Sequence, residues 1–445
     1  MKRVMCVLIL MVLGLIPVLN IAAEDKVVIT VFEGQDLRIA VHRALEPIIE
    51  AKLPNVDFQI VEGPPTGPQH NTKLITELRG GVGADIFRVG EIQAEIVASG
   101  FAVDITDRVE AWSDWEQFYE PAKEAMRQIG NGRIYSLPFS GSAMAIWYRK
   151  DLLKEAGIPE DQPQTWDELL DIARKVVANS RAEYGLMFPM GAIWGHGPYN
   201  EGFKHMLIGS STPFIQAEDG RVIASSKGLL ETFKFYETLV KEELFQTDAM
   251  LAPTPHMIPK YQQFPAGILA METQGTWGWR YDYGPEGATP IENITEKVGT
   301  WGFPSRDGSR PPYIVGDFGH VFMINANSKH PDLAWEVLKI ITSAEACGRF
   351  SLNVGGIAAR KDARDAFPEY GKHPELLADE DRLAELKNLP KFEGENAVLQ
   401  AVATATEHLL LGRTAEEALV VYKNNILQAN RRDMEGRTVI LPLEE

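Results

Sequence analysis

Short apolar runs and longer amphipathic segments alternate along the N-terminal part of the chain. Runs rich in β-branched residues predict strands at residues 27–32, 57–61 and 84–89. Segments with apolar residues at helical spacing predict helices at residues 37–50, 72–79 and 91–99. This order of strand and helix is typical of a parallel sheet covered by helices. No repeat with a period of about 20 to 50 residues is present, which excludes solenoids and propellers.

Two further helices have start signals that follow from backbone hydrogen bonding. Thr165 and Glu168 form a capping box, in which each side chain can bond to the backbone N–H at the other position. This box predicts a helix that runs to about Val177. Pro331 suits the first turn of a second helix, and from Ala334 apolar residues follow at i, i+3, i+4 and i+7. That helix should bury one stripe against the core.

Composition and charge narrow the class of protein. The chain has 445 residues, of which 45% are hydrophobic and 24% charged, which excludes a disordered chain, a collagen and a multispanning membrane protein. Its length predicts about three units, which large α/β folds merge into two lobes. The net charge of −18 repels phosphate backbones, so nucleic acid is not expected as a partner. The two cysteines cannot form a disulfide framework.

The first 23 residues have the pattern of a secretory signal peptide. Two basic residues precede an apolar run at residues 4–19, which is shorter than the roughly 20 residues of a membrane-spanning helix. A retained anchor is the alternative. Cleavage after Ala23 would release a periplasmic or secreted protein, and Cys6 lies too early in the run to be the modified cysteine of a lipoprotein. Cys347 then remains unpaired.

Five segments have the order and spacing of one known signature. They are ADIF at residues 84–87, GFAVDIT at 100–106, YSLP at 135–138 with IWYRKDLL at 146–153 and TWDEL at 165–169, FPAG at 264–267 with GTW at 275–277, and the helix at 331–344 followed by GGIAAR at 355–360. Together they resemble the extracellular solute-binding proteins of family 1, the maltose- and sugar-binding components of ABC transporters. Arg149 replaces the usual asparagine of the third segment, and the last segment lacks the family's proline.

The resemblance implies an α/β fold of the type II periplasmic-binding-protein class. Two lobes joined by several crossovers would hold one small solute, a sugar or oligosaccharide, in the cleft between them and close over it by a hinge. One lobe would contain residues 24–140 and 319–353, and the other residues 141–318 and 354–445. The implied partners are the solute and the membrane permease, with the receptor itself a monomer. Nothing in this resemblance implies a cofactor or metal.

Five candidate site residues lie near the first predicted strands. Glu33, Gln35 and Asp36 follow the first strand, where members of the family contact ligand hydroxyls. The alternative is that they are solvated turn residues. Arg88 and Glu91 stand at the end of the third strand, in a position similar to the family's ligand-contacting loop. Here the alternative is an ion pair without a ligand.

Other candidates lie where the chain is expected to cross between lobes and where aromatic residues follow glycines. Ser140 and Ser142 would line the cleft or only give the crossover its spacing, and Asp317 would accept from ligand hydroxyls or hold a turn. Trp277 could stack on the C–H face of a sugar ring, or could instead belong to the core. Trp279 would share its face if this segment is a strand.

A glycine-rich segment at residues 191–199 adds two aromatic candidates. Trp194 and Tyr199 resemble in position a family loop that delivers an aromatic side chain to the ligand. The pair Gly355-Gly356 is expected to give the backbone freedom at a third crossover.

Motifs for catalysis are absent from the sequence. It has no phosphate-binding loop of the G-x-x-x-x-G-K-[ST] type, no G-x-S-x-G, no H-E-x-x-H and no C-x-x-C, so it predicts no cofactor, no metal and no enzyme. Two other functions stay open. An exported carbohydrate-active enzyme could use paired carboxylates such as Glu33 with Asp317 or Glu91 with Glu272. A ligand sensor would use the same cleft with a different partner.

Overall fold

The structure is a computed structural model that describes most of the chain. It covers residues 26–65, 67–90, 92–388, 392, 394–430 and 434–443. The predicted signal peptide, residues 1–23, lies outside the described residues. The same is true of Glu91.

A large mixed sheet runs through the described residues. It contains β1 (Val27–Glu33), β2 (Val56–Glu62), β3 (Ile86–Val89), β4 (Ser136–Arg149), β6 (Met271–Gly275), β7 (Val298–Trp301), β8 (Ile314–Ile324), β9 (Ile357–Ala358) and β10 (Leu386–Asn388). The order along the main path is β2-β1-β3-β8-β4-β6, while β10 pairs with β8, and β7 and β9 pair with β4. A second, small sheet pairs β5 (Val222–Ser225) with β11 (Thr438–Ile440) in parallel.

The prediction of a parallel sheet is correct for its first part and for the pairing of β10 with β8, but not for the other strand pairs. β1 pairs in parallel with β2 and β3, as expected from the strand and helix order near the N-terminus. β3 with β8, and β4 with β8, β6, β7 and β9, are antiparallel. The reason is that β4 and β8 are long strands that return from one half of the molecule to the other, which a pattern of local alternation does not reveal.

Helices cover the sheet in both halves of the molecule. In the half that contains β1 they are α1 (Asp36–Lys52), α2 (Pro68–Gly80), α3 (Gln93–Ala98), α4 (Thr106–Glu110), α5 (Glu120–Ile129), α12 (Pro331–Ile341) and α13 (Ala344–Val354). The remaining α-helices are α6 (Lys150–Glu155), α7 (Trp166–Asn179), α8 (Lys204–Ile208), α9 (Lys227–Lys241), α10 (Phe264–Ala266), α11 (Ile294–Lys297), α14 (Ala363–Ala366), α15 (Pro374–Asp381), α16 (Glu395–Leu410), α17 (Ala415–Ala429) and α18 (Met434–Arg437).

Short 3₁₀- and π-helical turns lie in the connections between these elements. Three of the described turns are π-helical, η3 (Tyr199–Phe203), η5 (Pro259–Gln263) and η6 (Gly278–Asp282). The described 3₁₀ turns are η1 (Ser113–Gln117), η2 (Ala192–Trp194), η4 (Asp248–Leu251), η7 (Tyr370–Lys372) and η8 (Leu383–Glu385). π-Turns occur often at functional sites, and two of them, η3 and η6, carry candidate residues.

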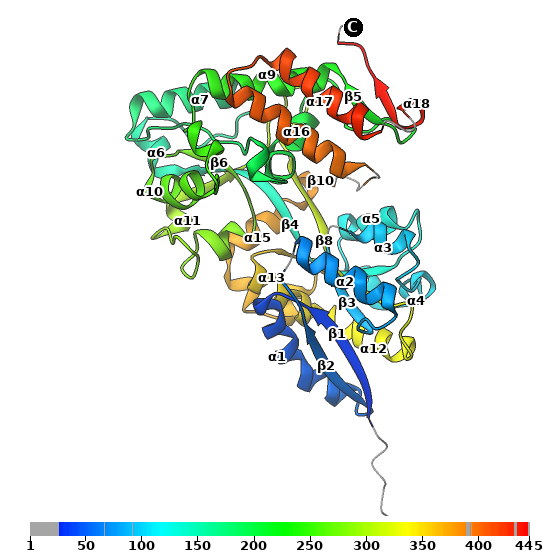
Figure 1. The fold of residues 1–445 in the computed structure, drawn as a ribbon. Helices are drawn as coiled ribbons and strands as arrows, with labels where there is room; N and C mark the ends of the chain where they lie inside the picture. The colour runs from blue at the N-terminus through cyan, green and yellow to red at the C-terminus, as the bar shows by residue number, and fades with distance from the viewer. Residues whose placement is uncertain are drawn as a thin grey trace, which may run out of the picture.

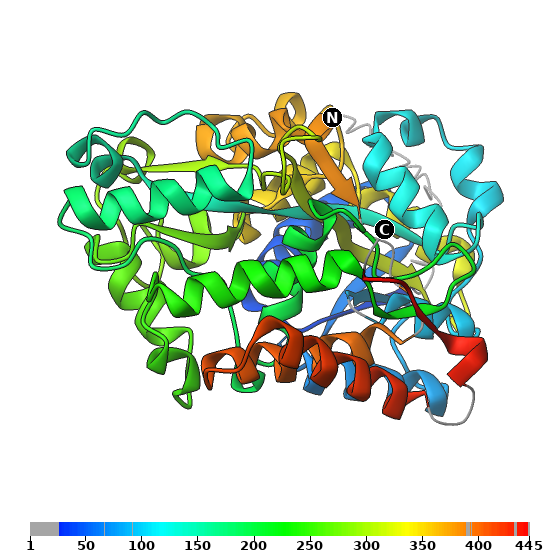
Figure 2. The same cartoon turned by 90° about the horizontal axis from the view of Figure 1, so that it is seen from above.

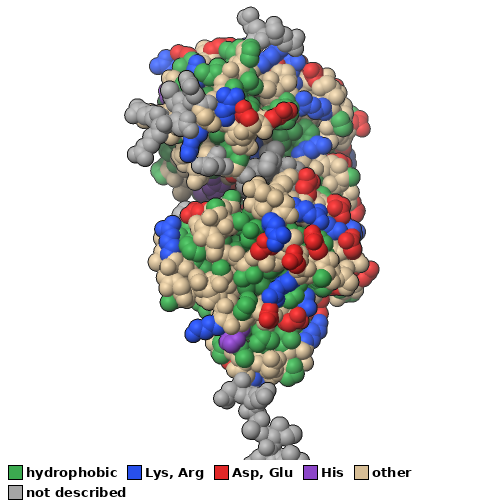
Figure 3. All heavy atoms as spheres, turned by 90° about the vertical axis from the view of Figure 1, so that its right-hand side faces the viewer, with side chains coloured by type: hydrophobic (Ala, Val, Ile, Leu, Met, Phe, Trp, Pro, Cys, Tyr) green, Lys and Arg blue, Asp and Glu red, His purple; other side chains and the backbone are tan. Residues whose placement is uncertain are grey.

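The elements are arranged in two halves, one above the other (Figure 1), with β4 and β8 running from one to the other. α9, α16 and α17 pack side by side across the top of the upper half, as the view from above shows (Figure 2). The space-filling view shows a constriction between the two halves and a mixture of both charge signs on the lower one (Figure 3). The molecule therefore has the two-lobed outline that the sequence predicts.

The start signals in the sequence predicted the beginnings of α7 and α12 correctly. The capping box at the start of α7 is present, with the Thr165 hydroxyl accepting from the Glu168 N–H at 3.1 Å. α12 begins at Pro331 as predicted. Asp85 has a structural role, because its carboxylate accepts hydrogen bonds from Thr30 of β1 and from the Ser328 hydroxyl. It thereby ties β1 to the turn that follows β8.

The core is continuous across both halves. Buried side chains of the long strands, such as Ile146 and Phe322, belong to the same hydrophobic cluster as Val31 of β1. Cys347 is buried and unpaired. Within the described residues, no helix combines the length and the apolar character that a membrane crossing requires.

Candidate functional site

Three strands of the central sheet bring candidate residues together. In the register of β4 and β8, Ser142 lies directly opposite Asp317. β6 pairs with the other edge of β4, where Gly275 stands opposite Met144. The segment that follows β6 therefore starts beside Ser142. As a result, Trp277 lies near Ser142 and Asp317 in space, although the three residues are far apart in sequence.

These residues line a pocket of about 230 Å³, which we call the central pocket. Its walls come from β4, β8, the turn after β6, and the helical segment that includes η3 and α8. The lining residues are Ser142, Met144, His196, Asn200, Glu201, Lys204, His205, Trp277, Val315, Gly316 and Asp317. The pocket thus combines an aromatic wall with hydroxyl, amide, carboxylate and ammonium groups, which is the composition of a site for a small polar solute.

Trp277 owes its position to the glycine two residues before it. A Cβ added at Gly275 would lie 2.1 Å from the Trp277 ring, so the indole folds back over the glycine backbone. Trp277 itself is half-buried and starts η6 in the helical region. The prediction that Trp277 and Trp279 share a strand face is therefore wrong, because the chain turns into a π-helix immediately after β6.

A buried network of charged groups lies behind the central pocket. The Lys260 ammonium is 3.0 Å from Glu201 Oε2, and only 7% of its side chain is exposed. Burial alone would raise the pKa of Glu201, but Lys260 outweighs it and lowers that pKa. Glu201 thus presents a carboxylate to the pocket that is held in place from behind.

Glu272 is the most perturbed acid of this network. It is fully buried on β6 and accepts a hydrogen bond from the Tyr283 hydroxyl, while its Oε2 atom has no partner. Burial raises the pKa of Glu272 to about 8, against the opposing effect of Lys260. Asp282 accepts from Tyr261 at 2.8 Å and from the Gln274 amide at 3.0 Å, and burial raises its pKa as well.

In the opposite half, Glu33 is buried at the end of β1. Its Oε1 atom accepts from the N–H groups of Gly34 and Gln35 at 2.8 and 3.2 Å and lies 3.7 Å from Arg38 Nη1. Burial alone would raise the pKa of Glu33, but Arg38 and then Arg88 outweigh it, so the pKa is lowered. The carboxylate therefore stabilises the start of α1 with one oxygen, while Oε2 has no hydrogen-bond partner.

Arg88 lies on β3 beside β8. It is 5% exposed, and its Nη2 atom is 3.0 Å from His320 Nδ1. The Gln93 amide donates to the backbone carbonyls of Gly90 and Gly319 and so fixes the turn after β3 to β8. Glu91, the other candidate of this loop, lies outside the described residues.

The two halves touch through Gln35. Its side-chain amide donates to the Tyr281 hydroxyl of η6 at 2.9 Å, across 246 positions in the sequence. Asp36, the first residue of α1, is exposed. Of the candidates Glu33, Gln35 and Asp36, it is therefore Gln35 that contacts the other half.

Ser140 is fully buried where the strands cross between halves. Its hydroxyl accepts from the Ser351 hydroxyl at 3.0 Å and donates toward the Ile357 carbonyl at 3.3 Å. A Cβ at Gly356 would lie 2.4 Å from Ser140 Oγ, so only a glycine fits there. Gly355 has a φ of 63°, which glycine adopts without strain, in agreement with the predicted backbone freedom at this crossover.

The aromatic candidates of residues 191–199 lie beside the central pocket. Tyr199 is buried and lines a neighbouring pocket of about 120 Å³, which we call the outer slot. The indole of Trp194 folds over Gly197, where an added Cβ would lie 2.0 Å from it, and its ring centre is 6.2 Å from that of His256. Neither side chain is among those that line the central pocket.

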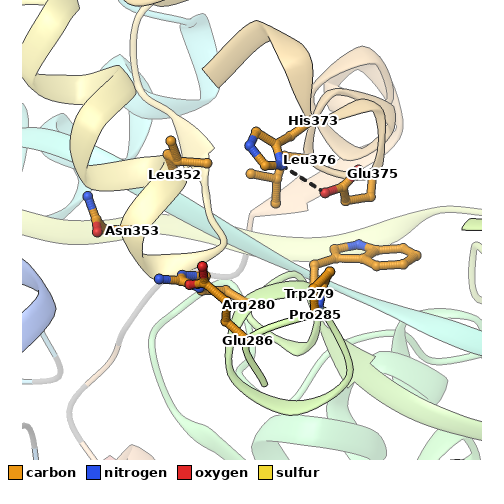
Figure 4. Close-up of a pocket in the computed structure, with 9 residues that line it drawn as sticks. All are labelled: Trp279, Arg280, Pro285, Glu286, Leu352, Asn353, His373, Glu375 and Leu376. Atoms are coloured by element: carbon orange, nitrogen blue, oxygen red, sulfur yellow. Dashed lines mark hydrogen bonds and ion pairs between the residues drawn. The ribbon is translucent and has the colours of Figure 1, made fainter. Parts of the chain in front are cut away.

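Trp279 faces a third pocket of about 260 Å³ between α13, η6 and α15. In Figure 4 its indole lies beneath the His373 and Glu375 pair, and Leu352 of α13 forms the opposite wall. Its ring centre is 4.3 Å from that of Trp147, and it is 9% exposed. η6 thus separates this pocket from the central pocket, with Trp277 on one side and Trp279 on the other.

Sequence reasoning missed the helical wall of the central pocket. Asn200, Glu201, Lys204 and His205 line it from η3 and the start of α8. The available signal was the cluster of polar residues between the aromatic candidates and the apolar end of that helix. Among the described residues, no group of three or more His, Cys, Asp or Glu side chains is placed so that it could hold a metal ion.

The chain matches known proteins over most of its length. The family model for bacterial extracellular solute-binding proteins matches residues 41–346. An uncharacterized ABC transporter extracellular-binding protein of Pyrococcus horikoshii is 23% identical over 407 residues, which is 88% of this chain and 84% of the relative. The chain therefore belongs to the bacterial extracellular solute-binding protein family.

Solved structures agree with this assignment at the level of the fold. The sugar-binding protein MalE of Xanthomonas citri superposes with a TM-score of 0.76 at 17% identity, covering 91% of this chain and 98% of that one. Maltose-bound MalE3 of T. maritima gives a TM-score of 0.71 at 20% identity, with 90% and 99% covered. These similarities confirm the predicted fold class.

Proposed function

We propose that this protein is the solute receptor of an ABC transporter and that its solute is a sugar or oligosaccharide bound in the central pocket. The observation that carries the proposal is the placement of Ser142, Trp277 and Asp317 on three adjacent chain segments around one cavity. The solved relatives support it, because the named ligand of one of them is maltose. Family membership supports an extracellular or periplasmic location and a membrane permease as partner.

The groups in the central pocket suit a sugar for chemical reasons. A sugar ring has an apolar C–H face, which packs on a flat indole such as that of Trp277. Its hydroxyls both donate and accept, and the pocket offers acceptors on Asp317 and Glu201 and both functions on Asn200 and Ser142. Polar groups that orient a ligand within a partly aromatic wall are typical of small-molecule sites.

We further propose that the two halves close over the solute. One lobe would hold residues 24–140 and 319–353, and the other residues 141–318 and 354–445. Glu33, Gln35, Asp36, Arg88 and Glu91 would then approach the solute from the first lobe, and Ser140, Ser142, Trp194, Tyr199, Trp277, Trp279 and Asp317 would belong to the site or its surroundings. The Gln35 to Tyr281 contact supports this arrangement, since it already bridges the halves beside η6.

Binding without chemical change is part of the proposal. Of the carboxylates considered for an enzyme, Glu33 holds the start of α1 and Glu272 is fully buried on β6. The test is hydrolysis of a chromogenic glycoside. If the protein hydrolyses it and Glu33→Gln abolishes this activity, the receptor hypothesis is contradicted and an enzyme is favoured.

The direct test is a calorimetric screen of mono- and oligosaccharides followed by Trp277→Ala. We expect the substitution to weaken binding about 5-fold to 150-fold, which corresponds to the roughly 1 to 3 kcal/mol of a buried aromatic contact. Trp112→Ala is the matched control, because Trp112 is a half-buried tryptophan that packs on Trp335, away from the pocket. Unchanged affinity in Trp277→Ala would remove the indole from the site. A screen without any binding sugar would refute the sugar assignment.

A further inference from the structure

The outer slot lies directly beside the central pocket and differs from it in chemistry. Its walls are mainly aliphatic and aromatic side chains from η3, α8, the loop before β5 and Phe392, with Leu207, Ile208, Pro213, Phe214 and Ile215 among them. The polar lining groups are few, and the Gln216 amide already donates to the Gly220 carbonyl at 2.7 Å. An occupant of this slot would therefore contact mainly carbon atoms.

Lys204 lies at the border of the two cavities, because it lines both. Its ammonium lies 3.1 Å from Asn200 Oδ1, which belongs to the central pocket, and 5.5 Å from the centre of the Tyr199 ring, which belongs to the outer slot. A ligand that passes Lys204 would leave a polar cavity and enter an apolar one within the span of a single side chain.

The apolar wall of the slot is open to water. Phe214 is 62% exposed, although it stands next to Pro213 and Ile215, which are half-buried. The loop is held in place, because the Ile223 N–H of β5 donates to the Ile215 carbonyl at 2.9 Å. An apolar surface that is fixed, concave and exposed is stabilised when a ligand covers it.

We propose that the solute is amphiphilic, with a glycosyl group in the central pocket and an apolar substituent, such as an alkyl or aryl group, in the outer slot. The proposal rests on the proposed sugar-receptor function and specifies the ligand class. A second sugar ring is a poorer occupant than an alkyl group, because its hydroxyls would lose water without gaining hydrogen-bond partners among Leu207, Ile208 and Ile215.

The experiment compares methyl and hexyl β-glycosides of glucose, galactose and mannose by titration calorimetry. For a sugar that binds, the hexyl glycoside should bind about tenfold tighter or more than the methyl glycoside, since several methylenes leave water. Phe214→Ser should remove this gain and leave the methyl glycoside affinity unchanged, whereas Phe214→Leu should retain it. Val82→Ser is the matched control, an exposed apolar residue of the other half.

The outcomes separate this proposal from the general function. Equal affinities for methyl and hexyl glycosides, or a hexyl gain that persists in Phe214→Ser, overturn the amphiphilic ligand while the sugar receptor stands. A disaccharide whose extra ring gives a larger gain than the hexyl group, lost in Phe214→Ser, assigns the slot to an oligosaccharide and also overturns it. Hexyl glycosides that bind through Phe214 while no methyl glycoside or free sugar binds support the apolar slot and refute the sugar pocket.

Discussion

The carboxyl group of Glu272 holds a proton in the core of the folded protein, and it would release this proton in the unfolded chain. Its carboxyl is sealed on β6 behind the central pocket, and burial raises its pKa to about 8 from an ordinary value of 4.5. Between these two values the folded state binds more protons than the unfolded state. The free energy of unfolding therefore falls as the pH rises through this range, and the contribution of Glu272 is fully present only below about pH 4.5.

Glu272→Gln should remove this dependence, because the amide has the same shape and stays neutral. Between pH 5 and pH 8 the variant should gain on the order of 3 to 4 kcal/mol of unfolding free energy relative to the wild type, measured by denaturant titration at each pH. The exposed Glu218→Gln is the control and should run parallel to the wild type. Parallel curves for Glu272→Gln would mean that Glu272 is ionised in the folded protein.

Candidate ligand contacts could be predicted from the sequence where a strand end or a glycine marked the position. Ser142, Trp277 and Asp317 were proposed as ligand contacts on such signals, and the structure brings them to one pocket. Burial was not predictable, because it depends on distant partners. Glu33 is predicted to be a ligand contact or a solvated turn residue, yet it is fully buried, with Arg38 and the start of α1 beside its carboxylate.

At the scale of elements, helix caps and the spacing of apolar residues predict the helices. The arrangement of the sheet depends instead on how its strands pair. α7 and α12 begin where their signals predict. β8 begins at Ile314 and includes Asp317, so this candidate residue lies within a strand. The long strands could not be predicted, because their length follows from crossing between halves. The π-turn after β6 has no sequence signature of comparable strength.

The end of α13 gives a prediction at this scale. Gly355 closes the helix with a φ of 63°, and a Cβ there would lie 2.8 Å from Arg280 Cβ and 3.1 Å from Trp277 Cα. Gly355→Ala must therefore bear the left-handed backbone cost of about 1 to 2 kcal/mol and also displace η6. We expect a larger loss of unfolding free energy than that cost alone, and weaker solute binding because Trp277 shifts.

Gly412→Ala separates the two effects. Gly412, after α16, has a φ of 82°, and an added Cβ there meets nothing within 4 Å. It should lose only the backbone part, measured by denaturant unfolding, and keep its affinity for the solute in calorimetry. Equal losses in the two variants, with binding intact in both, would show that α13 does not position η6.

At the scale of the whole molecule, family membership and fold indicate two halves with one site between them. Local sequence signals carry no information on the distance between those halves. The two long strands connect them, and the described hydrogen bonds include a direct side-chain link from Gln35 of the first half to Tyr281 of η6. If the halves close as proposed, a contact of this kind would stabilise the closed form and be lost when the halves separate, so it would bias the equilibrium between the two forms.

Tyr281→Phe tests this bias. The substitution removes the hydroxyl that accepts from Gln35 and keeps the ring, so it should cost the closed form about 0.5 to 1.5 kcal/mol and weaken solute binding by about two- to tenfold. Solute should still reduce the radius of gyration in small-angle scattering, but at higher concentration than in the wild type. Tyr184→Phe, whose backbone pairs with Leu269, is the control and should bind as the wild type does. If solute leaves the scattering of the wild type unchanged, the halves do not close. If it compacts both variants equally at equal concentration, the contact between Gln35 and Tyr281 does not contribute to closure.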